Sequence, residues 1–151
     1  MLHQLLANQV LWVALLASFV AQGMKLIGRY LESGKLDFHV LVETGGMPSS
    51  HAALVAALAV GIGIQEGWDS MLFAASVVFA FIVMYDAAGI RLAASKQARV
   101  LNKIVEESFS EKPHFNEERL KELLGHTPIQ VIAGAALGSF LASLCVPLWQ
   151  F

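Results

Sequence analysis

Four long apolar runs constrain this chain more than any other feature of its sequence. They cover about residues Leu5–Ile27, Ser49–Gln65, Ser70–Leu92 and Pro128–Trp149. As a helix, each run is long enough to cross, or nearly cross, the roughly 30 Å hydrocarbon core of a bilayer. The composition agrees, because 56% of the 151 residues are hydrophobic and 15% are charged, whereas a soluble domain carries about 25% charged residues. We therefore expect a single all-α domain over residues 1–151, a polytopic membrane protein built as a bundle of about four transmembrane helices.

The basic residues indicate how this bundle is oriented. All ten lysines and arginines lie in two stretches, one from the end of the first run to the second run and one from the end of the third run to the fourth. They are Lys25, Arg29 and Lys35 in the first stretch, and Arg91, Lys96, Arg99, Lys103, Lys112, Arg119 and Lys121 in the second. Because basic loops stay in the cytoplasm, we expect both stretches inside and both termini on the opposite side, in the cell membrane if the source is bacterial. The net charge of −2 argues against a nucleic-acid partner.

Small residues suggest how the helices pack. Two series recur every four residues: Ala53, Ala57 and Gly61 in the second run, and Gly134, Gly138 and Ala142 in the fourth. This spacing allows helix backbones to approach closely in lipid, although generic alanine-rich sequence explains the second run equally well. The only cysteine, Cys145, excludes an intramolecular disulfide and a cysteine-rich metal site.

The longest polar region lies between the third and fourth runs. Four of its residues lie three or four apart and share one face if the third helix continues beyond the membrane; they are Arg91, Ser95, Arg99 and Asn102. A solvated helix face is the other interpretation. Further on, Asn116 is a suitable N-cap for a short helix ending near Gly125. We expect a cytoplasmic helical excursion here, after which Thr127 and Pro128 open the fourth run.

Chemically active side chains gather at one end of each predicted helix. In an up-and-down bundle, these ends meet at one membrane face. The residues concerned are Lys25 and Arg29, the segment 45–51, Asp86 and Arg91, and His126. Helix N-termini and glycine-rich turns present N–H groups to anions, cations bind phosphate oxygens, and histidine serves as a nucleophile or general acid. Together they predict an anion site, although each histidine alone also fits a local hydrogen bond at the interface.

Several segments resemble a known family. GGMPSSHAA, YDAAGIR, QARVLN and LGHTPIQVIAG are similar to the divergent, small-membrane-protein branch of the type 2 phosphatidic acid phosphatase and vanadium haloperoxidase superfamily. The resemblance extends from about Lys25 to Gly138, and residues 46–51 look like the Pro-Ser-Gly-His motif of the superfamily. It implies phosphate chemistry without a metal or another cofactor.

The resemblance also implies a role for each site residue. A histidine in the last motif attacks phosphorus, so His126 would be the nucleophile. The histidine of the Pro-Ser-Gly-His motif protonates the leaving alkoxide and later activates water, so His51 would be the acid and base. The phosphate oxygens would be held by Lys25, Gly46, Ser49, Ser50 and Arg91, with Arg99 as the second candidate for the arginine.

Three departures from the superfamily pattern affect this interpretation. No Arg-Pro pair follows Lys25, and Leu120 occupies the place of an arginine expected shortly before the last histidine. Gln130 stands where the superfamily has an aspartate four residues after the nucleophile. Gln130 shares a helical face with His126 and can orient its ring, but it carries no charge to stabilise an imidazolium. Asp86 is the residue we expect to compensate.

Two functions therefore remain open. The first is a metal-independent membrane phosphatase that hydrolyses a lipid phosphate or diphosphate through a phosphohistidine intermediate. The second is a non-catalytic membrane protein that binds an anion or a lipid and retains the shape of the site. Lys25, His51 and His126 favour the enzyme, whereas Gln130 favours the binding protein. Membrane lipids are partners in both cases, and a homo-oligomer is left open.

Overall fold

The described part of the chain is helical. The computed structural model describes residues 2–35, 46–109 and 125–148, and these residues include no strand. In chain order the helices are α1 (Leu2–Leu6), α2 (Gln9–Ser33), α3 (Ser50–Glu66), α4 (Met71–Ala88), α5 (Ile90–Phe109) and α6 (Pro128–Leu148). Each of the four apolar runs forms a helix, which confirms the prediction of an all-α membrane protein.

The helices differ in how far they reach across a bilayer. Three segments are long and apolar enough to span it: Gln9–Ser33, Met71–Glu106, which joins α4 to α5, and Pro128–Leu148. Helix α3 has 17 residues and is about 25 Å long, slightly less than the roughly 30 Å of a hydrocarbon core. As expected, the second run is the shortest.

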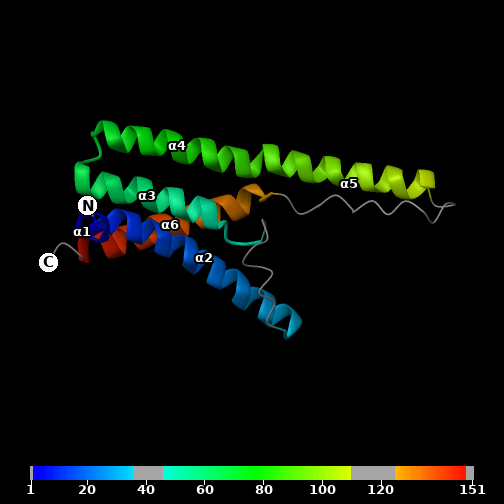
Figure 1. Ribbon diagram of the computed structural model, residues 1–151, viewed down its shortest axis with the longest axis horizontal. Helices are drawn as coiled ribbons and strands as arrows, with labels where there is room; N and C mark the ends of the chain where they lie inside the picture. Colours follow the sequence, from blue (N-terminus) through cyan, green and yellow to red (C-terminus); the bar gives the residue numbers. More distant parts are fainter. Residues whose placement is uncertain (1, 36–45, 110–124, 149–151) are drawn as a thin grey trace.

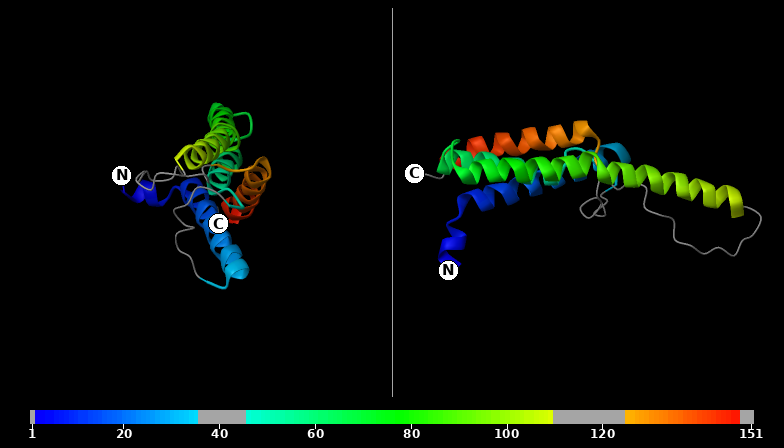
Figure 2. Two further views of the ribbon diagram at one scale, coloured as in Figure 1. Left: turned by 90° about the vertical axis from the view of Figure 1, so that its right-hand side faces the viewer. Right: turned by 90° about the horizontal axis from the view of Figure 1, so that it is seen from above.

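Helices α2, α3, α4 and α6 form an up-and-down bundle (Figure 1). Helix α3 lies at its centre, where it packs against α2, α4 and α6; the views in Figure 2 show these neighbours around it. The C-terminal parts of α2 and α4 therefore lie at the same end of the bundle as the N-termini of α3 and α6. This is the arrangement on which the predicted site depends.

The first membrane-spanning helix, α2, begins and ends later than predicted. The expected span was about Leu5–Ile27, but the helix is interrupted between Leu6 and Gln9. The side chain of Asn8 accepts a hydrogen bond from a backbone N–H of the first turn of α2 at 3.0 Å. At the other end α2 continues to Ser33, and Gly34 ends it with a φ of 67°, a conformation that favours glycine. Lys25 consequently lies inside α2, two turns before its end.

Small side chains fill the centre of the bundle. The buried cluster includes Ala14, Ala17, Ala21, Ala53, Ala57 and Ala142. At Gly138, a Cβ atom would lie 2.0 Å from the carbonyl oxygen of Ala53, and at Gly134 it would lie 2.2 Å from the carbonyl oxygen of Ser49. Any side chain at either glycine would force α3 and α6 apart. Both predicted series of small residues therefore lie at helix contacts.

Helix α5 continues almost in line with α4 and extends beyond the bundle (Figure 1). This confirms that the third helix is followed by a further helical segment. Its polar residues do not share one solvated face, since Ser95 and Asn102 are buried whereas Arg99 is exposed. The short helix predicted from Asn116, and Leu120 within it, lie outside the described residues.

Candidate functional site

Backbone hydrogen bonds join three helix ends at the site. The N–H of Ser49, the N-cap of α3, donates to the carbonyl of Gln130 in the first turn of α6 at 3.0 Å. The N–H of His126 donates to the carbonyl of Ala87, at the end of α4, at 3.1 Å. The hydroxyl of Ser49 also accepts the N–H of Ala52 at 3.3 Å, which caps α3. The N-termini of α3 and α6 are thus fixed beside the C-terminus of α4.

One half of a capping box at the start of α6 brings the side chain of Gln130 against His126. The side-chain oxygen of Gln130 accepts the backbone N–H of Thr127 at 3.0 Å and lies 3.3 Å from Nδ1 of His126. A threonine followed three residues later by glutamine is the sequence pattern of this motif. Because the oxygen is an acceptor, we assign the ring proton to Nδ1, which leaves the lone pair on Nε2. The side chain of Gln130 thus contacts the ring that the sequence predicted it to orient.

Lys25 places a positive charge inside the bundle at the level of the site. Its side chain is 6% exposed and continues the buried stripe of Ala14, Ala17 and Ala21 along α2. Gly46, at a φ of 77°, packs against its stem, since a Cβ atom there would lie 3.5 Å from Cδ of Lys25. A buried cation is costly without a compensating negative charge. Its position near two helix N-termini indicates a site suited to an anion.

The surroundings of His126 favour its neutral form. The side chain is 4% exposed. Burial lowers the pKa of His126 below its ordinary value, and the positive charges of Lys25 and His51 lower it as well. Hydrogen bonds with Gln130 and with the backbone of Gly46 act in the opposite direction without reversing the shift. A neutral imidazole keeps the lone pair that a nucleophile requires.

The other predicted site residues differ in burial and in how near they lie to His126 and Lys25. Ser50 is the buried first residue of α3, and the exposed His51 follows it in the same turn. Asp86 is half-buried and directly precedes Ala87, so it lies at the level of the site. Arg91 is the second residue of α5, and its side chain lies outside what the structure describes. Helix α5 carries Arg99 about 15 Å beyond the end of α4, away from His126.

Two features of the site were missed by sequence reasoning. The capping box had a signal, because Thr127 and Gln130 stand at its defining spacing. The contact of His126 with the carbonyl of Ala87 had no signal in the sequence. Every residue supplies a backbone acceptor, and only the fold determines which of them the N–H of His126 meets.

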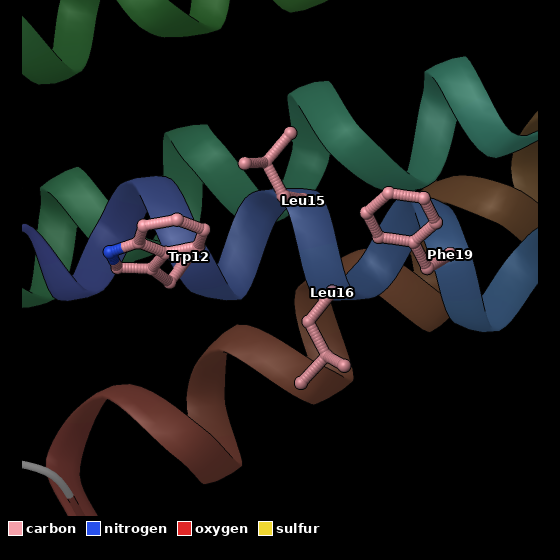
Figure 3. Close-up of a pocket in the computed structure, with 4 residues that line it drawn as sticks. All are labelled: Trp12, Leu15, Leu16 and Phe19. Atoms are coloured by element: carbon pink, nitrogen blue, oxygen red, sulfur yellow. The ribbon is translucent and has the colours of Figure 1, made fainter. Parts of the chain in front are cut away.

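A hollow of about 320 Å³ lies elsewhere, along α2. Its lining residues are Trp12, Leu15, Leu16 and Phe19, which are all apolar and all belong to this one helix (Figure 3). The indole N–H of Trp12 already donates to the carbonyl of Leu6 at 3.2 Å. The hollow therefore suits hydrocarbon and not a phosphate.

The fold and the site define a class of protein: a helical membrane protein with a buried histidine and a buried lysine where several helix ends meet. Comparison with known proteins gives the family. The chain belongs to the Divergent PAP2 family, whose model matches residues 6–141. It is 43% identical over 148 residues to the uncharacterized membrane protein YuiD of Bacillus subtilis (strain 168), in an alignment that covers 91% of this chain and 94% of that protein. No solved structure matches the chain. The family confirms the resemblance seen in the sequence motifs.

Proposed function

We propose that this protein is a metal-independent membrane phosphatase that hydrolyses a lipid phosphate or diphosphate through a phosphohistidine intermediate. One observation carries the proposal: His126 is buried, is hydrogen-bonded at Nδ1 to Gln130, and lies close enough to Lys25 for that charge to lower its pKa. Membership of the Divergent PAP2 family supports the same chemistry.

The reaction proceeds in two balanced steps. First, Nε2 of His126 attacks phosphorus, the bond from phosphorus to the leaving oxygen breaks, and protonated His51 gives its proton to that oxygen. Lys25 and the N–H groups at the start of α3 stabilise the charge on the phosphoryl oxygens. Water then attacks the phosphohistidine, His51 takes its proton, and the nitrogen–phosphorus bond breaks to release phosphate. Asp86 is proposed to support the imidazolium in place of the missing aspartate.

The remaining parts of the phosphate cradle are also proposals. Ser49 and Ser50, both buried at the start of α3, contribute polar groups at the site. Arg91 is the better candidate for the arginine, because Arg99 lies farther along α5.

The test of this function is phosphate release by the purified protein in detergent, measured against a panel of lipid phosphates and diphosphates. His126→Ala should abolish turnover, and His51→Ala should slow it and accumulate an acid-labile phosphoenzyme. His3→Ala is the matched control, since His3 is exposed on α1 at the other end of the bundle. Vanadate should inhibit and EDTA should not. Full activity of His126→Ala would exclude the mechanism, and an absolute Mg²⁺ requirement would indicate another phosphatase class.

We further place the site on the cytoplasmic side, because the lysines and arginines are confined to the two stretches at that end. In a Cys145→Ser background, a cysteine at the exposed Lys35 should resist a membrane-impermeant thiol reagent until cells are opened. A cysteine at the exposed Asp69, between α3 and α4 at the opposite end, should react in intact cells. The reverse labelling pattern would place the site outside.

A non-catalytic anion-binding protein is the second candidate, and the neutral Gln130 favours it. In that case the protein should bind a lipid phosphate without releasing phosphate from it. Binding is measured by ³¹P NMR of the lipid phosphate in detergent, and Lys25→Gln should weaken it. Binding without turnover by wild-type protein across the whole panel would select this candidate over the phosphatase.

A further inference from the structure

Helix α5 exposes a stripe of large apolar side chains. The exposed members are Ile90, Val100, Leu101, Ile104 and Val105, whose exposures range from 38% to 64%. At 100° per residue they fall on one side of the helix. The buried residues of α5 point elsewhere around the helix: Ser95, Ala98 and Asn102. The centre of the apolar stripe therefore lies roughly 120° around the helix from the centre of the buried side, with Val105 next to Ala98 at the border between them.

The length of the helix places this stripe outside the hydrocarbon core. The span from Met71 to Glu106 has 36 residues and is about 54 Å long, whereas a bilayer measures about 40–45 Å with its headgroups. Helix α4 alone, at 18 residues, extends over about 27 Å. A straight continuation would hold Leu101 and Ile104 roughly 20 Å beyond the end of α4, in water. A row of exposed apolar side chains there is unfavourable and indicates an interaction surface.

The charges of α5 indicate the chemistry of the partner. Its first four charged residues are all basic, and the acidic residues come only at its far end. The basic residues are Arg91, Lys96, Arg99 and Lys103. An apolar stripe bordered by basic residues is typical of a helix that lies in the interface of an anionic membrane. The stripe also follows directly on α4, whose Phe79 and Ile82 are exposed on its outer surface.

We infer that α5 lies on the surface of an anionic membrane, with Leu101 and Ile104 inserted among the lipid headgroups. In the structure α5 runs almost in line with α4 (Figure 1). Gly89 is the point at which it would turn, since its φ of −105° and ψ of −80° depart from helical values between α4 and α5. A turn away from the covered side of α5 brings the apolar stripe down onto the bilayer. This surface is separate from the phosphatase chemistry and does not depend on it.

Two adjacent residues provide the test. Lys103 and Ile104 lie at nearly the same height along α5 but point about 100° apart. Each is replaced by a cysteine carrying an environment-sensitive fluorophore, in the full chain with Cys145→Ser. The protein is placed as a single copy in nanodiscs of phosphatidylcholine and phosphatidylglycerol that contain brominated lipid as quencher. Phe79 gives the lipid-exposed reference and Lys35 the aqueous one.

The label at Ile104 should be quenched severalfold more than the label at Lys103, and the difference should shrink in pure phosphatidylcholine. Leu101→Glu should reduce the quenching at Ile104, whereas Leu101→Met should preserve it; unchanged quenching at Phe79 shows that the bundle has folded. Equal, weak quenching at both positions would show that α5 projects into water and overturn the inference. Protection of Ile104 only when two copies share a nanodisc would assign the stripe to a second copy of the chain instead.

Discussion

The crossing of α3 and α6 can be tested by adding a single methyl group. In Gly138→Ala, the new Cβ atom would lie 2.0 Å from the carbonyl oxygen of Ala53 and 2.8 Å from its carbonyl carbon. The opposing atoms belong to the backbone and cannot rotate away. Because favourable contacts begin at about 3.5 Å, α6 has to retreat from α3 by roughly 1 Å or more.

The cost has two parts. Overpacking of a tight contact destabilises a protein by about 1–3 kcal/mol. The same displacement stretches the bond from the N–H of Ser49 to the carbonyl of Gln130, now 3.0 Å long, and the loss of such a bond costs about 1 kcal/mol. We therefore expect Gly138→Ala to lower the free energy of unfolding by roughly 2–4 kcal/mol. It should also disturb the site, because Gln130 holds His126.

Gly23→Ala is the matched control, since nothing lies within 4 Å of a Cβ atom at that position of α2. It should be neutral or stabilise the helix by up to about 1 kcal/mol. Both variants are compared with the wild type by thermal unfolding in one detergent and by steric trapping of the unfolded state in bilayer discs. If Gly138→Ala proves as stable as Gly23→Ala, α3 and α6 do not make the close backbone contact described above.

Three further predictions concern the site. Because the pKa of His126 is lowered in the folded state, the unfolded chain binds this proton more readily, so the free energy of unfolding should fall as the pH drops below about 6.5. His126→Gln should flatten this pH dependence when unfolding is measured at several pH values. An unchanged slope would contradict the lowered pKa. Gln130→Glu keeps the shape but places a carboxylate beside Nδ1, so it should raise the pKa of His126 in an NMR titration of the imidazole, a result that an unmoved titration would refute. Lys25→Gln should lower kcat/KM for phosphate release by about ten- to a hundredfold, since a hydrogen bond to a charged group is worth about 1.5–3 kcal/mol; an undiminished value would remove Lys25 from the phosphate cradle.

The sequence was sufficient to predict the membrane-spanning helices, because an apolar segment in lipid must satisfy its backbone hydrogen bonds internally. The packing of α3 on α6 was also predictable, since glycines such as Gly134 and Gly138 leave room that other residues would fill. The ends of α2 were predicted less well, because they depend on local caps at Asn8 and Gly34 and not on hydropathy. Helix ends are set by such side-chain and backbone bonds.

The sequence predicts which residues come together at the candidate site better than it predicts how deeply each is buried. Up-and-down connectivity alone brings Lys25, His51 and His126 to one end of the bundle. The burial of Lys25 depends on how α2 packs, and the different exposures of Arg99 and Asn102 depend on what covers α5. Tertiary contacts decide such properties, and neither spacing nor hydropathy encodes them.

The bonds that tie Ser49 to Gln130 and His126 to Ala87 run between main-chain atoms. Every amino acid can accept such a bond and every one except proline can donate it. The bonds that hold these helix ends together therefore do not depend on the reactive side chains of the site. Mutation can thus exchange the reactive groups one at a time while the scaffold persists. In such a membrane bundle, hydrolysis and binding can therefore be exchanged by substitutions at the site while the fold is retained.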